Sequence, residues 1–125
     1  MKIHGIGTDI VSIDRIKKMS KNKNFLNRLF SKEEISKCSK LVNIHNCYAK
    51  RFAAKEAFSK ALGTGISNGI KFNEIIVLNE KSGKPFIKLT GNTKKKVNKK
   101  FKKANFSLSL SDEKKYAVAF VTISL

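Results

Sequence analysis

The 125-residue sequence contains no tryptophan, one proline, two cysteines and two histidines. Cys38 and Cys47 form no C-x-x-C motif, and His4 and His45 are isolated from other ligand types, so a transition-metal site has little support. We expect both cysteines to be reduced, partly buried thiols. No apolar run approaches the roughly 18 to 20 residues of a membrane span. Two glycines and an aspartate interrupt the N-terminal segment MKIHGIGTDI, which therefore does not resemble a secretory signal. We expect a cytoplasmic protein that makes no use of a membrane.

Acidic residues and arginine are also scarce. The chain has 27 Lys and Arg against 9 Asp and Glu, a formal net charge of +18, and its only arginines are Arg15, Arg28 and Arg51. This charge predicts a polyanionic partner, and nucleic acid, a phosphate-rich cofactor and an acidic protein all meet that description. Because arginine is better suited than lysine to bidentate phosphate contacts, each arginine is more informative than any single lysine.

Hydropathy patterns and turn residues predict a single compact domain over residues 1–125, of the α+β class, in which an antiparallel sheet of about five strands packs with three to four helices. The expected elements are a strand over 2–9, helices beginning near Ser12 and at the Ser31–Glu34 capping box, a helix over 46–62 that stops at Gly63, a hairpin of strands over 74–79 and 85–89, a basic surface helix over 93–104, and a second hairpin over 106–111 and 116–123.

Asp9 follows Gly5-Ile6-Gly7-Thr8 at the expected end of the first strand, where glycines would let a ligand approach the backbone. The third glycine of a dinucleotide fingerprint is missing, and no P-loop is present. Taken alone, Asp9 also fits a turn aspartate that bonds its own backbone.

Glu56 and Lys60 are four residues apart and lie on one face of the expected 46–62 helix. A surface ion pair is the simpler interpretation. However, Glu56 borders a face of small apolar residues, and the helix leads into Gly63-Thr64-Gly65, a loop whose amides could contact phosphate. Two carboxylates from separate elements, with lysine nearby, suit Mg²⁺ bound to a diphosphate. Metal-dependent phosphoryl transfer is thus one hypothesis, and a basic binding module is the other.

Three motifs carry a family resemblance: GIGTDIVSIDRI at residues 5–16, RFAAKEAFSKALGTGI at residues 51–66, and Gly83-Lys84-Pro85. Over essentially the whole chain, the sequence resembles the holo-acyl-carrier-protein synthases, the small single-domain group of 4′-phosphopantetheinyl transferases. The resemblance implies Mg²⁺-dependent transfer of phosphopantetheine from coenzyme A to a serine of apo acyl carrier protein. It implies release of adenosine 3′,5′-bisphosphate, a role in fatty acid biosynthesis, and a homotrimer with active sites where subunits meet.

The resemblance also assigns residues. It implies metal binding by Asp9 and Glu56, and catalysis by these two together with Lys60, which would contact the diphosphate. Coenzyme A would be bound by Arg51, Lys60, Gly63, Gly65, Gly83, Lys84 and Pro85. The carrier protein would dock on Arg15 and Met19, extended by Phe25 and Arg28. Glu56, or a metal-bound water beside it, is the candidate acceptor of the serine proton.

One position departs from the family pattern, because Ser107 stands where members commonly have a histidine near the nucleotide. A histidine general base at this position is therefore excluded, and coenzyme A should bind more weakly unless a lysine substitutes. Two alternatives to the transferase stay open: a nucleic-acid-binding module based on the lysine-rich 93–104 segment, and an inactive relative that keeps carrier binding. The lack of an aromatic platform or recognition helix argues against specific nucleic-acid binding.

Overall fold

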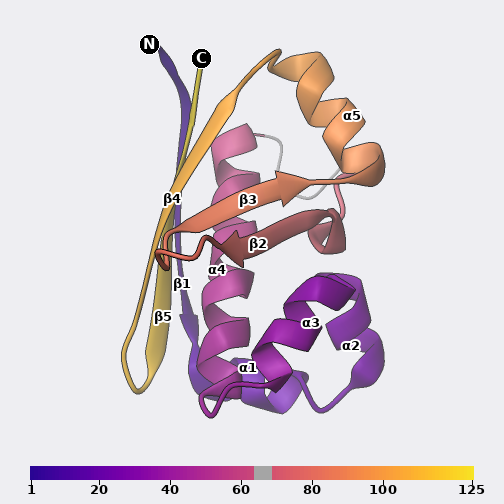
Figure 1. The fold of residues 1–125 in the computed structure, drawn as a ribbon, viewed down its shortest axis with the longest axis vertical. Coiled ribbons are helices and arrows are strands. Elements are labelled where there is room, and N and C mark those ends of the chain that lie inside the picture. Colours follow the sequence, from indigo (N-terminus) through magenta and orange to yellow (C-terminus); the bar gives the residue numbers. More distant parts are fainter. Residues whose placement is uncertain (64–68) are drawn as a thin grey trace.

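A three-stranded antiparallel sheet contains both ends of the chain (Figure 1). In the computed structural model, which describes residues 1–63 and 69–125, β1 (Ile3–Ser12) and β4 (Asn105–Asp112) flank β5 (Tyr116–Ser124). Side chains on β5 alternate between exposed and buried from Tyr116 to Val121, and the last three residues are half-buried or buried. One face of the sheet therefore belongs to the core, and the other is open.

Helix α4 (Ile44–Leu62) packs on the buried face of this sheet, with its backbone close to β1. A Cβ atom added at Gly7 would lie 1.8 Å from the Ala57 carbonyl oxygen, and one added at Gly5 would lie 2.0 Å from that of Ala61. No side chain fits at either position. The glycines before Asp9 thus admit helix α4, and the expectation that they let a ligand approach is wrong.

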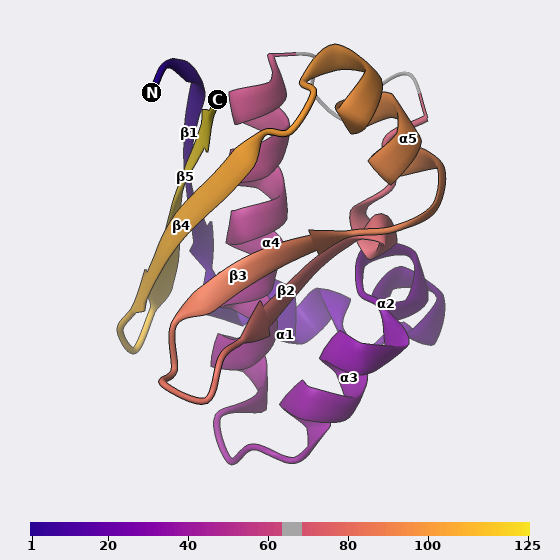
Figure 2. The same ribbon diagram turned by 45° about the horizontal axis from the view of Figure 1, so that its top comes forward.

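The opposite side of α4 is covered by a hairpin of β2 (Ile75–Asn79) and β3 (Pro85–Leu89), as the two ribbon views show (Figures 1 and 2). A short 3-10 helix, η1 (Phe72–Glu74), leads into β2. Helix α4 is therefore enclosed between two sheets, which explains why nearly every side of it is buried.

The remaining helices lie at the two ends of α4 (Figure 2). They are α1 (Ile13–Met19), α2 (Lys23–Leu29) and α3 (Lys32–Ser39) at its N-terminal end, and α5 (Gly91–Lys100) at the end nearer the chain termini. Helix α5 stops before the predicted residue 104 because Phe101 is extended and Lys103 has a φ of 55°. None of the helices that the structure describes has the length and apolar character needed to cross a bilayer.

Local sequence signals set several helix ends. The Ser12 hydroxyl accepts a hydrogen bond from the Arg15 amide and caps α1. At the start of α3, the Ser31 amide donates to Glu34 Oε1 and the Glu34 amide donates to Ser31 Oγ, so the predicted capping box is confirmed. Gly63 ends α4 with a φ of 80°, also as predicted.

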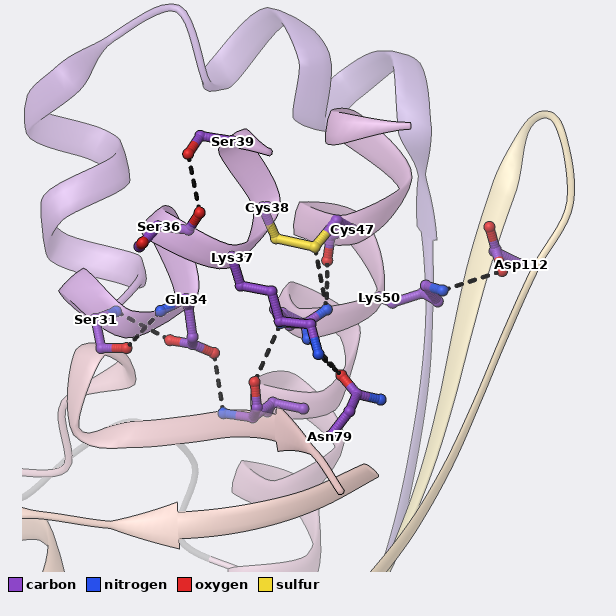
Figure 3. Close-up of a disulfide and its surroundings, with 12 residues drawn as sticks. Ser31, Glu34, Ser36, Lys37, Cys38, Ser39, Cys47, Lys50, Asn79 and Asp112 are labelled. Carbon is purple, nitrogen blue, oxygen red and sulfur yellow. Dashed lines mark hydrogen bonds and ion pairs between the residues drawn. A yellow bond between two sulfur atoms is a disulfide. The ribbon is translucent and has the colours of Figure 1, made fainter. Parts of the chain in front are cut away.

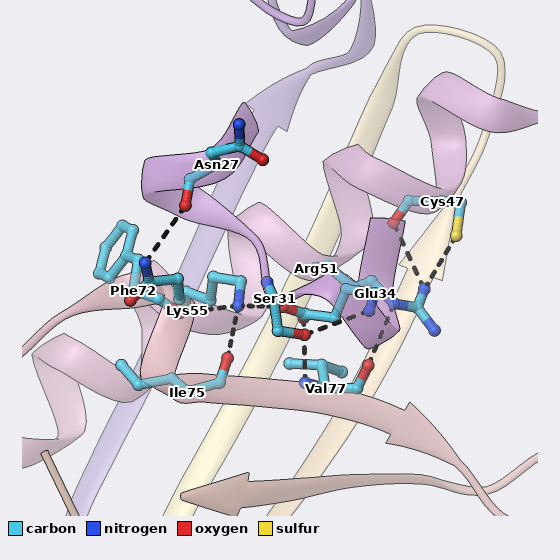
Figure 4. A network of polar contacts seen from close by, with 10 residues as sticks. Asn27, Ser31, Glu34, Cys47, Arg51, Lys55, Phe72, Ile75 and Val77 are labelled. Atoms are coloured by element: carbon cyan, nitrogen blue, oxygen red, sulfur yellow. Dashed lines mark hydrogen bonds and ion pairs between the residues drawn. The ribbon is translucent and has the colours of Figure 1, made fainter. Parts of the chain in front are cut away.

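Glu34 also forms a buried ion pair with Lys55, and both side chains are 0% exposed (Figure 4). Lys55 Nζ donates to Glu34 Oε1 at 2.7 Å, to the Phe72 carbonyl at 2.9 Å and to the Ile75 carbonyl. Glu34 Oε2 accepts from the Val77 amide at 3.0 Å. Burial lowers the pKa of Lys55 to about 8, although the carboxylate opposes this shift. The pair joins α3 and α4 to the start of β2.

Cys38 and Cys47 form a disulfide between α3 and α4, and both are buried (Figure 3). The expectation of reduced, partly buried thiols is therefore wrong. The short connection between these helices reverses the chain, so that the last turn of α3 meets the first turn of α4 with the two Cα atoms 5.5 Å apart. This distance lies within the range that a disulfide can bridge.

The α+β class, the single compact unit and the antiparallel strands are confirmed. Within residues 1–63 and 69–125, the five strands form two sheets, and there are five α-helices where three to four were predicted. The helix that sequence patterns missed is α2, which is capped by Asn22 and buries none of its residues fully.

Candidate active site

Asp9, near the end of β1, meets Lys60 of α4 at the edge of the core. Lys60 Nζ lies 3.2 Å from Asp9 Oδ1 and donates to the Thr8 carbonyl at 2.9 Å. The side chain of Asp9 is 17% exposed and that of Lys60 is 56% exposed. The ion pair of Lys60 thus links two elements, and it is not the local pair with Glu56 that helical spacing alone suggested.

Glu56 lies in the same electrostatic environment. Burial raises the pKa of its carboxyl, the negative charge of Asp9 raises it further, and Lys60 and Arg15 act in the opposite direction. The two carboxylates are therefore close enough to repel each other. A divalent cation would relieve this repulsion, and paired carboxylate oxygens suit Mg²⁺.

The protein contributes few groups to such a metal site. In the part of the chain that the structure describes, no group of three or more His, Cys, Asp or Glu side chains could hold a metal ion. Mg²⁺ usually takes one or two protein carboxylates and completes its coordination with water and phosphate oxygens. Asp9 and Glu56 therefore fit a metal that is shared with a phosphate-bearing substrate.

A cavity of about 630 Å³ opens beside Glu56. Three of the four residues predicted to dock a carrier protein, Met19, Phe25 and Arg28, line it together with Glu56. The other lining residues are Leu29, Phe52, Ile70, Lys71, Phe72 and Asn73. The fourth predicted residue, Arg15, is near enough to affect the pKa of Glu56. The first helices and the acidic site thus form one continuous region.

Arg51 lies on another side of α4 and is 3% exposed (Figure 4). Its Nε donates to the Val77 carbonyl at 3.1 Å, and its Nη1 contacts the Cys47 carbonyl oxygen at 3.4 Å and Cys47 Sγ at 3.2 Å. Lys60 is nine residues further along the helix, which corresponds to a rotation of about 180°. Within one chain, Arg51 therefore faces β2 while Lys60 faces β1.

The predicted Gly83-Lys84-Pro85 turn lies near Arg51. Gly83 has a φ of 95°, a conformation that favours glycine, and Pro85 begins β3 opposite Asn79. Asn79 bridges the two features, because its Oδ1 accepts from Arg51 Nη2 and its Nδ2 donates to the Gly83 carbonyl. Lys84 is exposed beside them. Sequence reasoning missed Asn79, since a polar residue before a turn is also typical of turns without a ligand.

The remaining predicted positions have mixed outcomes. Gly63 caps α4, and the space around an added Cβ is open. Gly65 lies outside the described residues. Ser107 is exposed on the open face of the sheet and pairs with Thr122. The ligand-binding roles of these residues stay predictions.

Comparisons with known proteins show the family to which the chain belongs. Residues 5–121 match the model of the 4'-phosphopantetheinyl transferase superfamily. A holo-[acyl-carrier-protein] synthase of Pelagibacter ubique is 54% identical over 125 residues, which cover 98% of each chain. The crystal structure of the Neisseria meningitidis holo-[acyl-carrier-protein] synthase has a TM-score of 0.89 and 39% identity, with 99% of this chain and 100% of that chain covered.

A Bacillus anthracis holo-(acyl-carrier-protein) synthase, solved in complex with CoA (3',5'-ADP), has a TM-score of 0.80 and 36% identity, with 97% of this chain and 96% of that chain covered. The chain belongs to the 4'-phosphopantetheinyl transferase superfamily, and within it to the holo-[acyl-carrier-protein] synthases.

Proposed function

We propose that this chain transfers 4′-phosphopantetheine from coenzyme A to a serine hydroxyl of apo acyl carrier protein, with Mg²⁺ as cofactor, in support of fatty acid biosynthesis. Adenosine 3′,5′-bisphosphate is the second product. The observation that carries the proposal is the convergence of Asp9, Glu56 and Lys60 beside the cavity of the first helices. The related Bacillus anthracis protein, solved with CoA (3',5'-ADP), supports the choice of substrate.

Asp9 and Glu56 would hold Mg²⁺, which when bound stabilises negative charge on phosphate oxygens. Lys60 supplies a second positive charge from the protein itself. Its ammonium group is oriented by Asp9 and the Thr8 carbonyl, and among residues 1–63 and 69–125 these two contacts leave one of its three N–H groups for a diphosphate oxygen. Its exposed position allows a substrate to reach it.

Glu56 is the candidate acceptor of the serine proton. Its side chain borders the cavity that also includes Met19 and Phe25, so a carrier docked on those residues would bring its serine close to the carboxylate. Arg15 and Arg28 would attract an acidic carrier, and the two apolar side chains would fix its position.

We extend the proposal to a homotrimer. Two features support it: the predicted coenzyme A residues fall into two groups on different sides of α4, and the open face of the sheet carries large apolar side chains. Ile6 is 61% exposed, Ile10 63% and Phe120 45%. An apolar face of this kind is typical of surfaces buried between subunits.

The activity is tested by incubating the protein with coenzyme A, Mg²⁺ and apo carrier and measuring the mass of the carrier. Asp9→Asn and Glu56→Gln should each lower turnover on the order of 10² to 10³-fold, because each removes a charge from the site. Asp14→Asn, an exposed change in the first turn of α1, is the matched control and should be near wild type. Absence of modified carrier, or activity that survives both an excess of chelator and these substitutions, would contradict the proposal.

The trimer is tested separately. Phe120→Glu places a charge on the open face of the sheet and should give monomers in sedimentation or light scattering. An unchanged mass would place the subunit contact elsewhere.

The alternative function, a basic nucleic-acid-binding module, predicts salt-sensitive binding to arbitrary duplexes that Asp9→Asn leaves unchanged. The cytoplasmic location stays a prediction.

A further inference from the structure

Asn79, the last residue of β2, connects three segments through its side chain (Figure 3). Its Oδ1 accepts a hydrogen bond from Arg51 Nη2 at 2.8 Å and another from Lys37 Nζ at 2.6 Å. Its Nδ2 donates to the Gly83 carbonyl at 3.0 Å. A single amide therefore links α4, α3 and the turn between β2 and β3.

The chemistry of this position suits an amide. Its oxygen accepts from two cations while its nitrogen donates to a carbonyl, and Asn and Gln carry this uncharged acceptor and donor on two different atoms. An aspartate would keep both cations but lose the donor, and it would cancel part of their positive charge. Asn79 thus holds two cations close to each other without neutralising either.

The cations that Asn79 orients face a cavity of about 300 Å³. Lys37, Lys50 and Arg51 contribute three positive charges to its lining, against one carboxylate, Asp112, which is 3.5 Å from Lys50 Nζ. Burial lowers the pKa of Lys37, and the charges of Arg51 and Lys50 lower it further. An anion in this cavity would relieve the mutual repulsion of the three cations.

Arg51 has a donor available for such an anion. Its Nε and Nη1 groups are bonded to Val77 and Cys47, and one Nη2 hydrogen is bonded to Asn79. The second Nη2 hydrogen has no acceptor within residues 1–63 and 69–125. The contacts of Asn79 and Cys47 therefore fix the direction of a guanidinium that can still bind one more oxygen.

We propose that Asn79 is a positioning residue for the nucleotide half of coenzyme A. It holds Arg51 and Lys37 at a fixed place relative to the Gly83-Lys84-Pro85 turn and does not itself need to touch the ligand. This inference rests on the proposed function, in which Arg51 and the turn bind coenzyme A. Lys37 then provides a further cationic donor in the cavity beside Arg51.

Two substitutions test the role. Asn79→Leu removes all three hydrogen bonds and should weaken the binding of adenosine 3′,5′-bisphosphate roughly tenfold, as measured by calorimetry. The KM for coenzyme A should rise by a similar factor, while kcat and the KM for the carrier stay within about twofold. Asn79→Asp should bind the bisphosphate more weakly still, because its carboxylate neutralises the cations. If Asn79→Leu does not fold, the affinity of Asn79→Asp for the bisphosphate is compared with that of the wild type instead, since this variant keeps the contacts with both cations.

Thr93→Val is the stability control. It removes the hydrogen bonds of a buried hydroxyl with Glu74 and the Lys71 amide, away from Arg51. It should lower the thermal midpoint without changing bisphosphate binding.

Three results would overturn the inference. The first is wild-type bisphosphate affinity in both Asn79 variants. The second is an equal loss of bisphosphate binding in Thr93→Val and Asn79→Leu at matched stability, which would mean a purely structural role. In the third, wild-type protein neither binds the bisphosphate nor modifies a carrier; the proposed function then fails, and this inference fails with it.

Discussion

The close contact between β1 and α4 allows a direct test of how the acidic site is assembled. In Gly7→Ala, the new methyl group would lie 1.8 Å from the Ala57 carbonyl oxygen, whereas ordinary contacts begin at 3.4 Å. The obstacle is helix backbone, so no change of rotamer relieves it, and α4 would have to move by about 1.5 Å in a closely packed core. We expect a loss of about 1 to 3 kcal/mol or more in the free energy of unfolding.

The same displacement should reduce activity. Gly7 precedes Asp9 by two residues and Ala57 follows Glu56 directly, so a shift between β1 and α4 changes the separation of the two carboxylates. A misplacement of about 1 Å costs on the order of 10²-fold in rate. The measurements are kcat/KM for carrier modification and the midpoint of urea unfolding. Gly5→Ala is a comparison variant: its added methyl group meets the Ala61 carbonyl oxygen at 2.0 Å, directly after Lys60, so a similar loss of stability should accompany a loss of activity that acts through Lys60.

A double variant tests whether the clash is with the helix backbone or with the Ala57 side chain. Ala57→Gly removes a methyl group but leaves the carbonyl oxygen in place, so it should not rescue Gly7→Ala. Rescue, or wild-type stability and kcat/KM in Gly7→Ala itself, would refute the steric argument.

Three further predictions concern buried groups. Lys55→Met leaves Glu34 buried without its cation, so the free energy of unfolding in urea should fall by about 3 to 5 kcal/mol. The double variant Lys55→Met/Glu34→Gln should recover part of this loss. An unchanged midpoint in Lys55→Met would mean that the pair contributes nothing. Burial lowers the pKa of Lys55 to about 8 from 10.5, so between these pH values the unfolded chain binds more protons than the folded chain. This lysine should therefore make the free energy of unfolding increase with pH over that range. That increase should be absent in Lys55→Met, and equal pH slopes in the two proteins would contradict the lowered pKa. The nine-residue separation of Cys38 and Cys47 predicts that reduction costs about 2.5 kcal/mol; two titratable thiols in the unfolded, unreduced protein would show that no disulfide forms.

Signals contained within a few residues predicted the local structure. The Ser31–Glu34 capping box and the glycine after α4 fixed helix ends, because the groups that satisfy the terminal amides and carbonyls are near in sequence. Both hairpins followed from alternation and turn residues. Helix α2 escaped prediction because it buries little apolar surface, so its periodicity is weak.

Features that depend on distant segments were harder to predict. The glycines of β1 were correctly seen as unusual, but the backbone that approaches them belongs to α4, about fifty residues later. The disulfide depends on the angle between α3 and α4, which residue spacing does not give. The structure places Asp9 and Glu56 near Lys60, from elements far apart in the sequence. The motif that contains Glu56 and Lys60 gave no indication that Arg51 faces β2.

The opposite directions of Arg51 and Lys60 on α4 have a consequence for mixed assemblies. In the proposed homotrimer, each copy of the helix would take part in two neighbouring catalytic centres, one through each side. A subunit carrying Arg51→Ala and a subunit carrying Glu56→Gln, each inactive alone, would then form some intact centres when combined. Recovery of activity on mixing would be intersubunit complementation, and helix α4 would be the element that makes it possible.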